Sequence, residues 1–327
     1  MKQDTRVLFV SAFHAPFIQD DLDILEPRFH VRRLIGSGVV QIFRILFAVP
    51  RSDVIVCWFA SVYGAVATIV GRFFGVKTII ILGGVDVAKH DELKYGLWRS
   101  AWKSGLVRSA IVHAGCVAVG DLSLRESAIK LAGYDGRNIL SLPPGFDNEF
   151  WKPVGEKESI VLTVAAVRDS RRLMVKGIDV LIEAARILPN IRFQVVGLDP
   201  RLVAGLGAPA NMWFEEAKRR EDLLPLYRKA KVYCQPSRIE AVSYTLREAM
   251  LCGCLPVVSD VGGMPTAVAG IGYLVPPADT DALVAALHQA MASEGELAGK
   301  SRARIVALYP REKRVADLVS IVERHSQ

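Results

Sequence analysis

Two patterns of apolar and polar positions alternate along this chain. Short apolar runs of the kind that form buried strands are separated by segments whose apolar residues recur with helical spacing. Strands are expected at residues 7–11, 53–58, 77–82, 116–119, 139–142, 159–165, 191–196, 232–235, 255–258 and 272–275. Helices are expected at residues 63–74, 122–132, 178–188, 223–230 and 279–291. This alternation of strand and helix predicts an α/β fold built on parallel sheets.

Two further helical segments allow two interpretations each. Residues 39–49 are strongly apolar with arginines in and around them, so they form either a helix buried against the sheet or a basic amphipathic helix on a membrane. The apolar residues leave no clean polar face, which favours the buried helix. Residues 89–108 are helical and basic. A solvated helix with Trp98 and Trp102 buried is favoured there over a surface for a phosphorylated or lipid-linked substrate.

Length and composition fit a globular protein with two domains. The chain has 327 residues, of which 51% are hydrophobic and 23% are charged, and this apolar content is sufficient for sizeable cores. The net charge of +7 suits an anionic ligand or an anionic membrane surface. Because the basic residues are dispersed and no nucleic-acid-binding motif occurs, a nucleic-acid partner is not expected.

The first residues and the cysteines indicate the cellular compartment and whether a metal site is expected. The first six residues are polar, so no signal peptide is expected, and no apolar stretch reaches the ~18 residues of a spanning helix. The five cysteines are odd in number, which favours a reduced compartment. Cys252 and Cys254 have no second Cys or His pair nearby, so no metal site is expected. We expect a cytoplasmic location, with peripheral contact at the inner face of the membrane as the alternative.

Residues 236–265 contain the most specific pattern in the chain. They predict a loop, a helix, a short buried strand and a turn at Gly262-Gly263. Ser243 is the expected N-cap of the helix, and Gly253 is expected to end it. Free N–H groups and the helix dipole at such a junction of loop and helix favour a phosphate group.

Two glutamates, Glu240 and Glu248, lie on either side of this junction in the sequence. A carboxylate beside a diphosphate would repel it, so each glutamate is expected to accept hydrogen bonds from sugar hydroxyls instead. The layout predicts a ligand that carries a sugar at each end of a diphosphate. The alternative is a pair of ordinary solvated glutamates.

The same stretch resembles the donor site of a known enzyme family. The segments P-S-x-x-E, E-A-M, C-G-x-x-P-V-V-S and G-G-x-P lie within thirty residues. Their order and spacing are similar to the signature of retaining glycosyltransferases of the family-four type. Ala241 and Ser243 stand where that family usually has glycines, and Thr266 stands where it usually has a glutamate.

The resemblance implies the GT-B fold, in which two Rossmann-like domains with parallel sheets face each other across a cleft. The acceptor-side domain would cover residues 1–150 and the donor-side domain residues 151–309, with a linker at 151–153. Residues 310–327 would form a terminal helix, after a break at Pro310, that packs back on the first domain.

On the donor side, the resemblance implies fixed cations that neutralise the diphosphate. Lys176 and Arg168 are expected to do so, with Arg172 as the rival arginine. Glu240 would contact the donor hexose, and Glu248 would hold the ribose hydroxyls. The catalytic candidates are thus Glu240, Lys176 and Arg168. The further donor-binding candidates are Ser243, Tyr244, Thr245, Leu246, Gly197, Gly84 and Asp86.

The acceptor side of the expected site departs further from the family. Relatives often have His-Gly-x-Asp after the third strand, whereas Gly83 stands here in place of that histidine. Ligands of Rossmann-type sheets bind at the carboxyl ends of the strands, so the loop after the first strand is expected to face the acceptor. His14 and Asp20 in this loop are the acceptor-side candidates.

The function implied by the resemblance is sugar transfer from a nucleotide diphosphate sugar to a hydroxyl acceptor, with retention of anomeric configuration. The acceptor would be a glycan or a lipid-linked substrate. No cofactor is expected beyond the donor as co-substrate, and charge stabilisation by protein cations is expected in place of a bound divalent ion. The alternatives are a nucleotide-sugar epimerase on the same fold and a non-catalytic nucleotide-sugar-binding protein.

Overall fold

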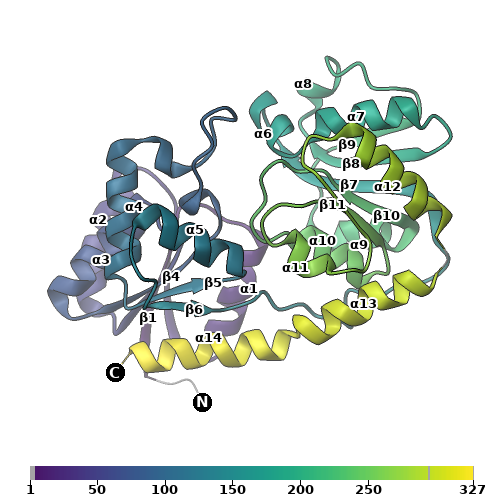
Figure 1. Ribbon diagram of the computed structural model, residues 1–327. Coiled ribbons are helices and arrows are strands. Elements are labelled where there is room, and N and C mark those ends of the chain that lie inside the picture. Colours follow the sequence, from purple (N-terminus) through teal and green to yellow (C-terminus); the bar gives the residue numbers. More distant parts are fainter. Residues whose placement is uncertain (1–3, 294, 327) are drawn as a thin grey trace. The chain divides into compact units, whose positions relative to one another are not determined.

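A computed structural model describes residues 4–293 and 295–326 of the protein (Figure 1). The chain forms two compact units. The N-terminal unit contains the residues up to Pro144 together with those from Glu312 on, and the C-terminal unit is Gly145–Arg311. Segments from both ends of the described chain therefore build the N-terminal unit.

A sheet of six parallel strands, counted over the described residues, forms the centre of the N-terminal unit. The strand order is β2-β1-β3-β4-β5-β6. The strands are β1 (Arg6–Ser11), β2 (His30–Ile35), β3 (Val54–Trp58), β4 (Lys77–Ile81), β5 (Cys116–Val119) and β6 (Ile139–Ser141). β3 and β5 are buried along their whole length, as expected of parallel strands that helices cover on both faces.

Successive residues of β1 point to opposite faces of this sheet, and each face has its own helices. Val7 and Phe9 pack with residues of α1 and α14, whereas Leu8 and Val10 pack with residues of α2 and α3. The α-helices are α1 (Pro16–Leu25), α2 (Val39–Ala48), α3 (Val62–Phe74), α4 (Ala101–His113), α5 (Leu122–Ala132) and α14 (Arg311–His325). Short 3₁₀ helices are η1 (Val49–Arg51), η2 (Val85–Val87) and η3 (Leu97–Arg99).

The C-terminal unit also has a parallel sheet, with six strands among the described residues. Its strand order is β12-β11-β10-β7-β8-β9. The strands are β7 (Glu158–Val167), β8 (Arg192–Leu198), β9 (Met212–Glu215), β10 (Ala230–Gln235), β11 (Leu255–Ser259) and β12 (Tyr273–Val275). The two sheets confirm the predicted α/β fold with parallel strands.

Helices pack on both faces of this second sheet as well. α7 and α12 share one core cluster with the sheet, and α9, α10, α11 and α13 share the other. The helices are α6 (Ser170–Val175), α7 (Ile178–Ile187), α8 (Pro200–Val203), α9 (Arg220–Lys229), α10 (Tyr244–Leu251), α11 (Met264–Val268), α12 (Thr280–Ala292) and α13 (Glu296–Leu308). Trp151, expected in a linker, is buried in the second cluster with its ring 5.6 Å from that of Tyr227.

Residues 39–48 form the predicted helix, which packs against the sheet as expected but is buried on one side only. Gln41, Ile45 and Ala48 are its buried residues, whereas Val39 and Phe47 are each 68% exposed. The sequence of α2 is apolar on both sides, so its hydrophobic pattern alone does not reveal which side meets the sheet.

The helix expected over residues 89–108 begins only at Ala101. Before it, a loop is closed by reciprocal backbone hydrogen bonds of 2.9 Å between His90 and Tyr95. Gly96 has φ +102, and because an α-helix requires negative φ, no helix continues through it. A Cβ there would also overlap the carbonyl oxygen of Ala88. Trp102 is 61% exposed, so its predicted burial is wrong.

A buried ion pair joins α14 to α1 within the N-terminal unit. Arg314 donates from Nε and Nη2 to the two carboxylate oxygens of Asp21 at 2.9 and 2.8 Å. Its Nη1 donates to the carbonyl oxygens of Leu142 and Pro143, and Trp58 Nε1 donates to Asp21 at 3.0 Å. The side chains of Arg314 and Asp21 are 5% and 0% exposed, so the pair is removed from water and held by several hydrogen bonds.

We expect Asp21→Asn to lower the free energy of unfolding by about 3 kcal/mol, because it leaves the buried guanidinium of Arg314 without its counter-charge. Urea denaturation followed by circular dichroism measures the change. The control is Asp317→Asn on the surface of α14, which removes an ion pair with Lys313 and should cost less than about 1 kcal/mol. Equal losses in the two variants would contradict a structural role for the buried pair.

Candidate functional site

The loop of residues 236–243, between β10 and α10, is the centre of the candidate site. Glycines on two other segments contact its backbone directly. Gly177 has φ +67, and a Cβ there would overlap the carbonyl oxygen of Pro236. Gly262 has φ +56, and a Cβ there would overlap the carbonyl oxygen of Glu240. Only glycine fits at either position. Because these two residues have no side chain, the segments that contain them can pack directly on the backbone of the loop.

Hydrogen bonds fix the same loop on both sides. The guanidinium of Arg238 donates to both carboxylate oxygens of Asp179, at 2.7 and 2.6 Å. The N–H of Arg238 donates to the carbonyl oxygen of Val175 at 2.9 Å. From the other side, the N–H of Gly263 donates to the carbonyl oxygen of Ala241 at 2.8 Å. The loop is therefore held in one conformation although it has no regular secondary structure.

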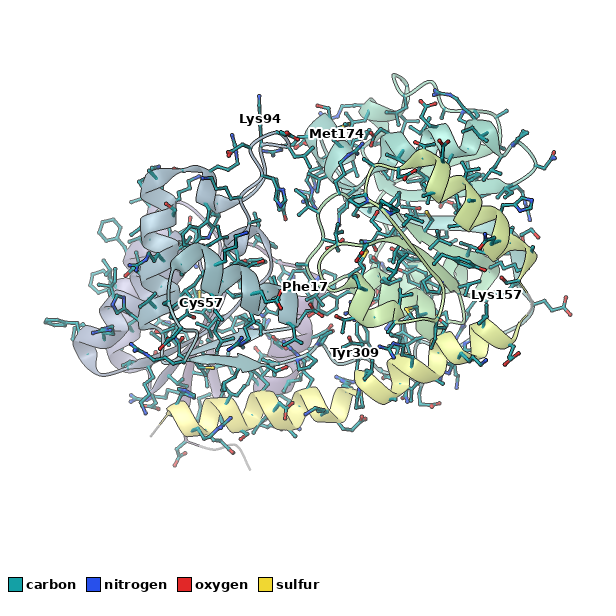
Figure 2. The ribbon with its side chains drawn as sticks, in the orientation of Figure 1. Phe17, Cys57, Lys94, Lys157, Met174 and Tyr309 are labelled. Carbon is teal, nitrogen blue, oxygen red and sulfur yellow. The ribbon has the colours of Figure 1, made fainter. Side chains whose placement is uncertain are left out.

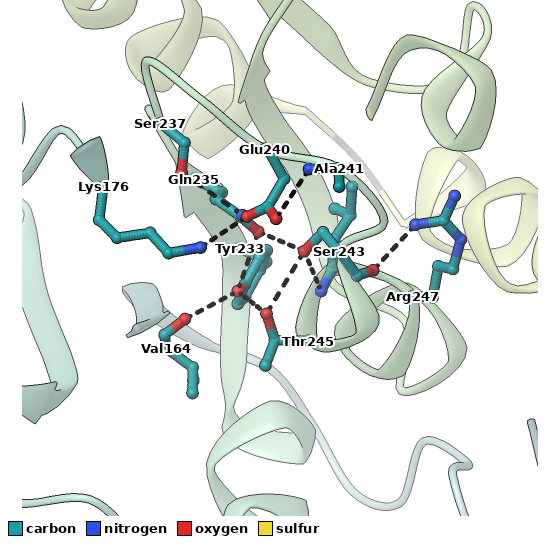
Figure 3. A network of polar contacts seen from close by, with 11 residues as sticks. Val164, Lys176, Tyr233, Gln235, Ser237, Glu240, Ala241, Ser243, Thr245 and Arg247 are labelled. Atoms are coloured by element: carbon teal, nitrogen blue, oxygen red, sulfur yellow. Dashed lines mark hydrogen bonds and ion pairs between the residues drawn. The ribbon is translucent and has the colours of Figure 1, made fainter. Parts of the chain in front are cut away.

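Glu240 and Lys176 are in direct contact (Figure 3). The distance from Lys176 Nζ to Glu240 Oε2 is 2.7 Å, and the two side chains are 16% and 13% exposed. Gln235 donates to the same carboxylate oxygen, and the N–H of Ala241 donates to Glu240 Oε1 at 3.1 Å. The sequence predicted both residues for different parts of a ligand, and the structure brings them together as an ion pair.

The electrostatics of this pair also depend on a nearby arginine. Burial raises the pKa of Glu240, but the charge and hydrogen bond of Lys176 oppose this, and the net pKa is lowered from 4.5. The N–H of Ala241 and the charge of Arg172 lower it further. Arg172 is four residues before Lys176 in α6, whereas Arg168 is exposed in the turn between β7 and α6. Arg172, the rival candidate, is thus the arginine whose charge acts on Glu240.

The N-terminus of α10 follows this loop, and its predicted cap is confirmed. Ser243 Oγ accepts from the N–H of Leu246 at 3.3 Å and donates to the Oε1 of Gln235 at 2.6 Å. The N–H of Leu246, a donor-binding candidate, is therefore occupied by the cap. Thr245 Oγ1 accepts from the hydroxyl of Tyr233 at 2.7 Å, and Gly253 ends the helix with φ +79, as predicted.

Arg247 fixes the first turn of α10 from inside the C-terminal unit. Its Nη1 donates to the carbonyl oxygen of Ser243 at 2.9 Å, and its Nη2 donates to that of Gly263 at 3.2 Å. Its guanidinium carbon lies 4.7 Å from the ring centroid of Tyr309, which Figure 2 labels. This fully buried cation links the helix start, the glycine turn and the residue after α13.

Glu248 has partners on α9. Arg220 Nε donates to Glu248 Oε1 at 2.7 Å, and the hydroxyl of Tyr227 donates to Oε2 at 3.3 Å. Arg220 also lies over the ring of Trp151, 5.4 Å from its centroid. The side chain of Glu248 is 4% exposed, so the alternative of a solvated glutamate is wrong. Sequence reasoning missed Arg220 and Tyr227, which lie outside the recognised motif.

Gly197 and Asp86 have structural explanations within their own units. Gly197 has φ +105 in β8, and a Cβ would overlap the carbonyl oxygen of Ala165, where the pairing of β7 with β8 is irregular. The fully buried carboxylate of Asp86 accepts from the N–H groups of Ala60 and Gly84 at 2.9 and 2.8 Å. These contacts let Asp86 order the loop that contains Gly84, and the donor-binding roles of Asp86 and Gly84 stay predictions.

The place of the family's histidine is occupied by an aromatic ring. Phe59 has φ +73, and its ring fills the space that a Cβ on Gly83 would need. The same ring lies 5.2 Å from that of Phe13 and 5.8 Å from that of Trp58, between centroids. A side chain at position 83 would require Phe59 to move, so the glycine and the phenylalanine depend on each other.

The acceptor-side candidates lie in two different settings. His14 is exposed in the turn between β1 and α1, and Asp20 lies on α1 because the predicted loop becomes a helix from Pro16 on. Their roles stay predictions. Over the described residues, no three His, Cys, Asp or Glu side chains gather as metal ligands, and the five cysteines are free and buried.

We expect Glu240→Gln to destabilise the protein in a pH-dependent manner. Because the folded pKa of Glu240 is below 4.5, the ion pair contributes its full stability above that pH and loses it as the pH falls through the folded pKa. Loss of the charged hydrogen bond should cost about 2 kcal/mol at neutral pH. Thermal unfolding from neutral pH to about pH 3 tests this. Glu149→Gln at an exposed position is the control, and a pH-independent difference for Glu240→Gln would contradict the expectation.

Comparison with known proteins identifies a family and individual relatives that this chain resembles. Residues 147–307 match the family Glycosyl transferases group 1. A D-inositol 3-phosphate glycosyltransferase of Mycobacteroides abscessus is 29% identical over 205 residues, covering 55% of this chain and 44% of that protein. An MMP alpha-(1->4)-mannosyltransferase of Mycolicibacterium hassiacum is 29% identical over 199 residues, covering 56% of this chain and 47% of that protein. The matches span less than half the length of these curated relatives.

Solved structures resemble the chain over almost its whole length. Sucrose-phosphate synthase from Thermosynechococcus elongatus has a TM-score of 0.80 at 16% identity, covering 98% of this chain and 99% of that chain. Anabaena HepE in complex with UDP has a TM-score of 0.78 at 15% identity, covering 98% and 100%. The fold is therefore the predicted GT-B fold, and residues 147–307 are similar to the Glycosyl transferases group 1 family.

Proposed function

We propose that the protein transfers a sugar from a nucleotide diphosphate sugar to a hydroxyl group of an acceptor, with retention of anomeric configuration. The observation that carries the proposal is the Lys176–Glu240 pair beside the capped N-terminus of α10. This arrangement offers a cation and a sugar-binding carboxylate within hydrogen-bonding distance of each other. It lies in the part of the chain that matches the glycosyltransferase family.

Lys176 can donate hydrogen bonds to a diphosphate while it keeps its hydrogen bond to Glu240. An ammonium group has three N–H donors, and Glu240 takes one of them through Oε2, so two remain for phosphate oxygens. Arg172, in α6 and four residues before Lys176, adds a second positive charge, which acts on Glu240. Charge that develops on the departing diphosphate would then be stabilised by fixed protein cations, without a requirement for a divalent ion.

Glu240 and Glu248 would hold the two sugars of the donor. Glu240 Oε1 accepts from the N–H of Ala241, which leaves acceptor capacity for a hydroxyl of the donor hexose. Glu248 is oriented by Arg220 and Tyr227, and it would accept from the ribose hydroxyls. Its side chain is 4% exposed, so little of the carboxylate is in contact with water.

The names of similar proteins guide the choice of substrates to test. Anabaena HepE has been solved with UDP and with UDP-glucose, which makes a uridine diphosphate sugar the first donor to test. Two curated relatives are named D-inositol 3-phosphate glycosyltransferase and MMP alpha-(1->4)-mannosyltransferase. We infer an acceptor hydroxyl on a glycan or a lipid-linked substrate.

A non-catalytic nucleotide-sugar-binding protein is the second candidate. One observation favours it: the ring of Phe59 fills the place of the family's histidine next to Gly83. Release of nucleoside diphosphate from a panel of UDP-, GDP- and ADP-sugars separates the two candidates, because a binding protein raises the melting temperature with nucleotide but gives no turnover. Interconversion of the sugar without transfer would instead indicate an epimerase.

We expect Lys176→Ala to lower kcat roughly a hundredfold, because it removes a fixed charge from the departing diphosphate. Release of nucleoside diphosphate from the donor that the panel identifies measures the effect. Lys229→Ala, an exposed lysine at the end of α9, is the control and should leave kcat unchanged. Arg172→Ala and Arg168→Ala decide between the rival arginines, and the larger loss is expected for Arg172. Unchanged turnover in Lys176→Ala would remove the diphosphate assignment.

We expect Glu248→Gln to weaken donor binding at least about tenfold, because hydrogen bonds to a charged acceptor are replaced by weaker ones. Isothermal titration with the nucleoside diphosphate measures the dissociation constant. Glu183→Gln on the exposed side of α7 is the control. A variant with a lower melting temperature but an unchanged dissociation constant would show that Glu248 only connects α10 to α9.

A further inference from the structure

Exposed apolar side chains are concentrated on two neighbouring helices of the N-terminal unit. Seventeen large apolar side chains are exposed over the described residues, and eight of them lie on α2 and α3. We call these eight the α2–α3 face: Val39, Val40, Phe43, Leu46, Phe47, Ile69, Phe73 and Phe74. Single exposed apolar residues are normal, but such a concentration marks a surface that binds something.

The geometry of the two helices directs these side chains away from the sheet. Residues 39, 43 and 47 are spaced by four, so they share one side of α2, whereas Ile45 and Ala48 pack on the other side against the sheet. On α3, residues 69 and 73 are also spaced by four. Phe73 is 83% exposed, and its ring lies edge-on to that of Phe74 at 5.1 Å.

The two helices of the α2–α3 face contain charged residues of one sign only. α2 and α3 contain 10 and 13 residues, and neither contains Asp or Glu. Arg44 and Arg72 are exposed on the helices themselves, and Arg51 and Lys77 are exposed directly after them. An apolar surface bordered by arginine and lysine complements lipid headgroups that carry negative charge.

We propose that the α2–α3 face binds the surface of a bilayer that contains anionic lipid. The phenylalanine rings would enter the boundary between headgroups and acyl chains, and the arginines would contact lipid phosphates. No helix in the described ranges is long and apolar enough to cross a bilayer, so this contact is peripheral. A second copy of the chain is a poorer partner, because the same face would bring arginine against arginine.

Vesicle sedimentation tests the proposal with the full chain. The protein should bind vesicles of phosphatidylcholine mixed with phosphatidylglycerol, and bind vesicles of phosphatidylcholine alone more weakly. Arg44→Gln and Arg72→Gln together should weaken binding by about fivefold per arginine, and raised salt should act in the same direction. Arg137→Gln, an exposed arginine on another part of the N-terminal unit, is the control.

A second variant isolates the apolar contribution. Phe43→Ser, Phe47→Ser and Phe73→Ser together should reduce the bound fraction at least about tenfold, because three rings lose their insertion sites. Val154→Ser with Ile187→Ser removes exposed apolar groups from the C-terminal unit and should leave binding unchanged. All of these positions are exposed, so an unchanged melting temperature is expected in each variant.

Three results would overturn the proposal. The first is that the wild type does not bind anionic vesicles. The second is that the control variant loses as much binding as the phenylalanine variant. The third is that the protein binds no lipid but forms a dimer, which the phenylalanine substitutions dissociate. Analytical ultracentrifugation measures the last of these. Vesicle binding requires no donor sugar and no turnover, so its failure is distinguishable from failure of the proposed glycosyl transfer.

Discussion

The candidate site depends on two places where a side chain would not fit. Gly177 and Gly262 let two segments lie directly on the carbonyl groups of the loop that contains Glu240. The forked contact between Arg238 and Asp179 then fixes that loop against α7. Because the backbone is held by close packing and hydrogen bonds, the Glu240 carboxylate is positioned before any ligand arrives, which lowers the entropic cost of binding.

Much of the fold could be predicted because its inner strands are short, wholly apolar runs. β3 and β5 are buried on both faces, and their sequences show it without any knowledge of tertiary structure. The edge strands β2 and β9 were not predicted. Each pairs on one side only. β2 includes the exposed Arg32 and Arg33, and β9 has only three apolar residues, Met212–Phe214, before Glu215.

The candidate site was predictable where its chemistry lies within one short stretch. The cap at Ser243 and the glycine that ends α10 follow from local rules that need no partner elsewhere in the chain. The partner of Glu248 could not be predicted in this way, because Arg220 lies 28 residues earlier and belongs to no motif. The glycosyltransferase resemblance likewise named Lys176 and Glu240 but gave no indication that they pair with each other.

The ion pair between Asp21 and Arg314 has a consequence for the order in which the molecule is made. Its partners are separated by 293 residues, so Asp21 leaves the ribosome long before the cation that neutralises it exists. Throughout translation of the C-terminal unit, the first sheet lacks α14, and the Asp21 carboxylate of α1 lacks the cation that will pair with it. The N-terminal unit therefore gains its last helix only after the whole C-terminal unit has been translated, although most of its own residues come first.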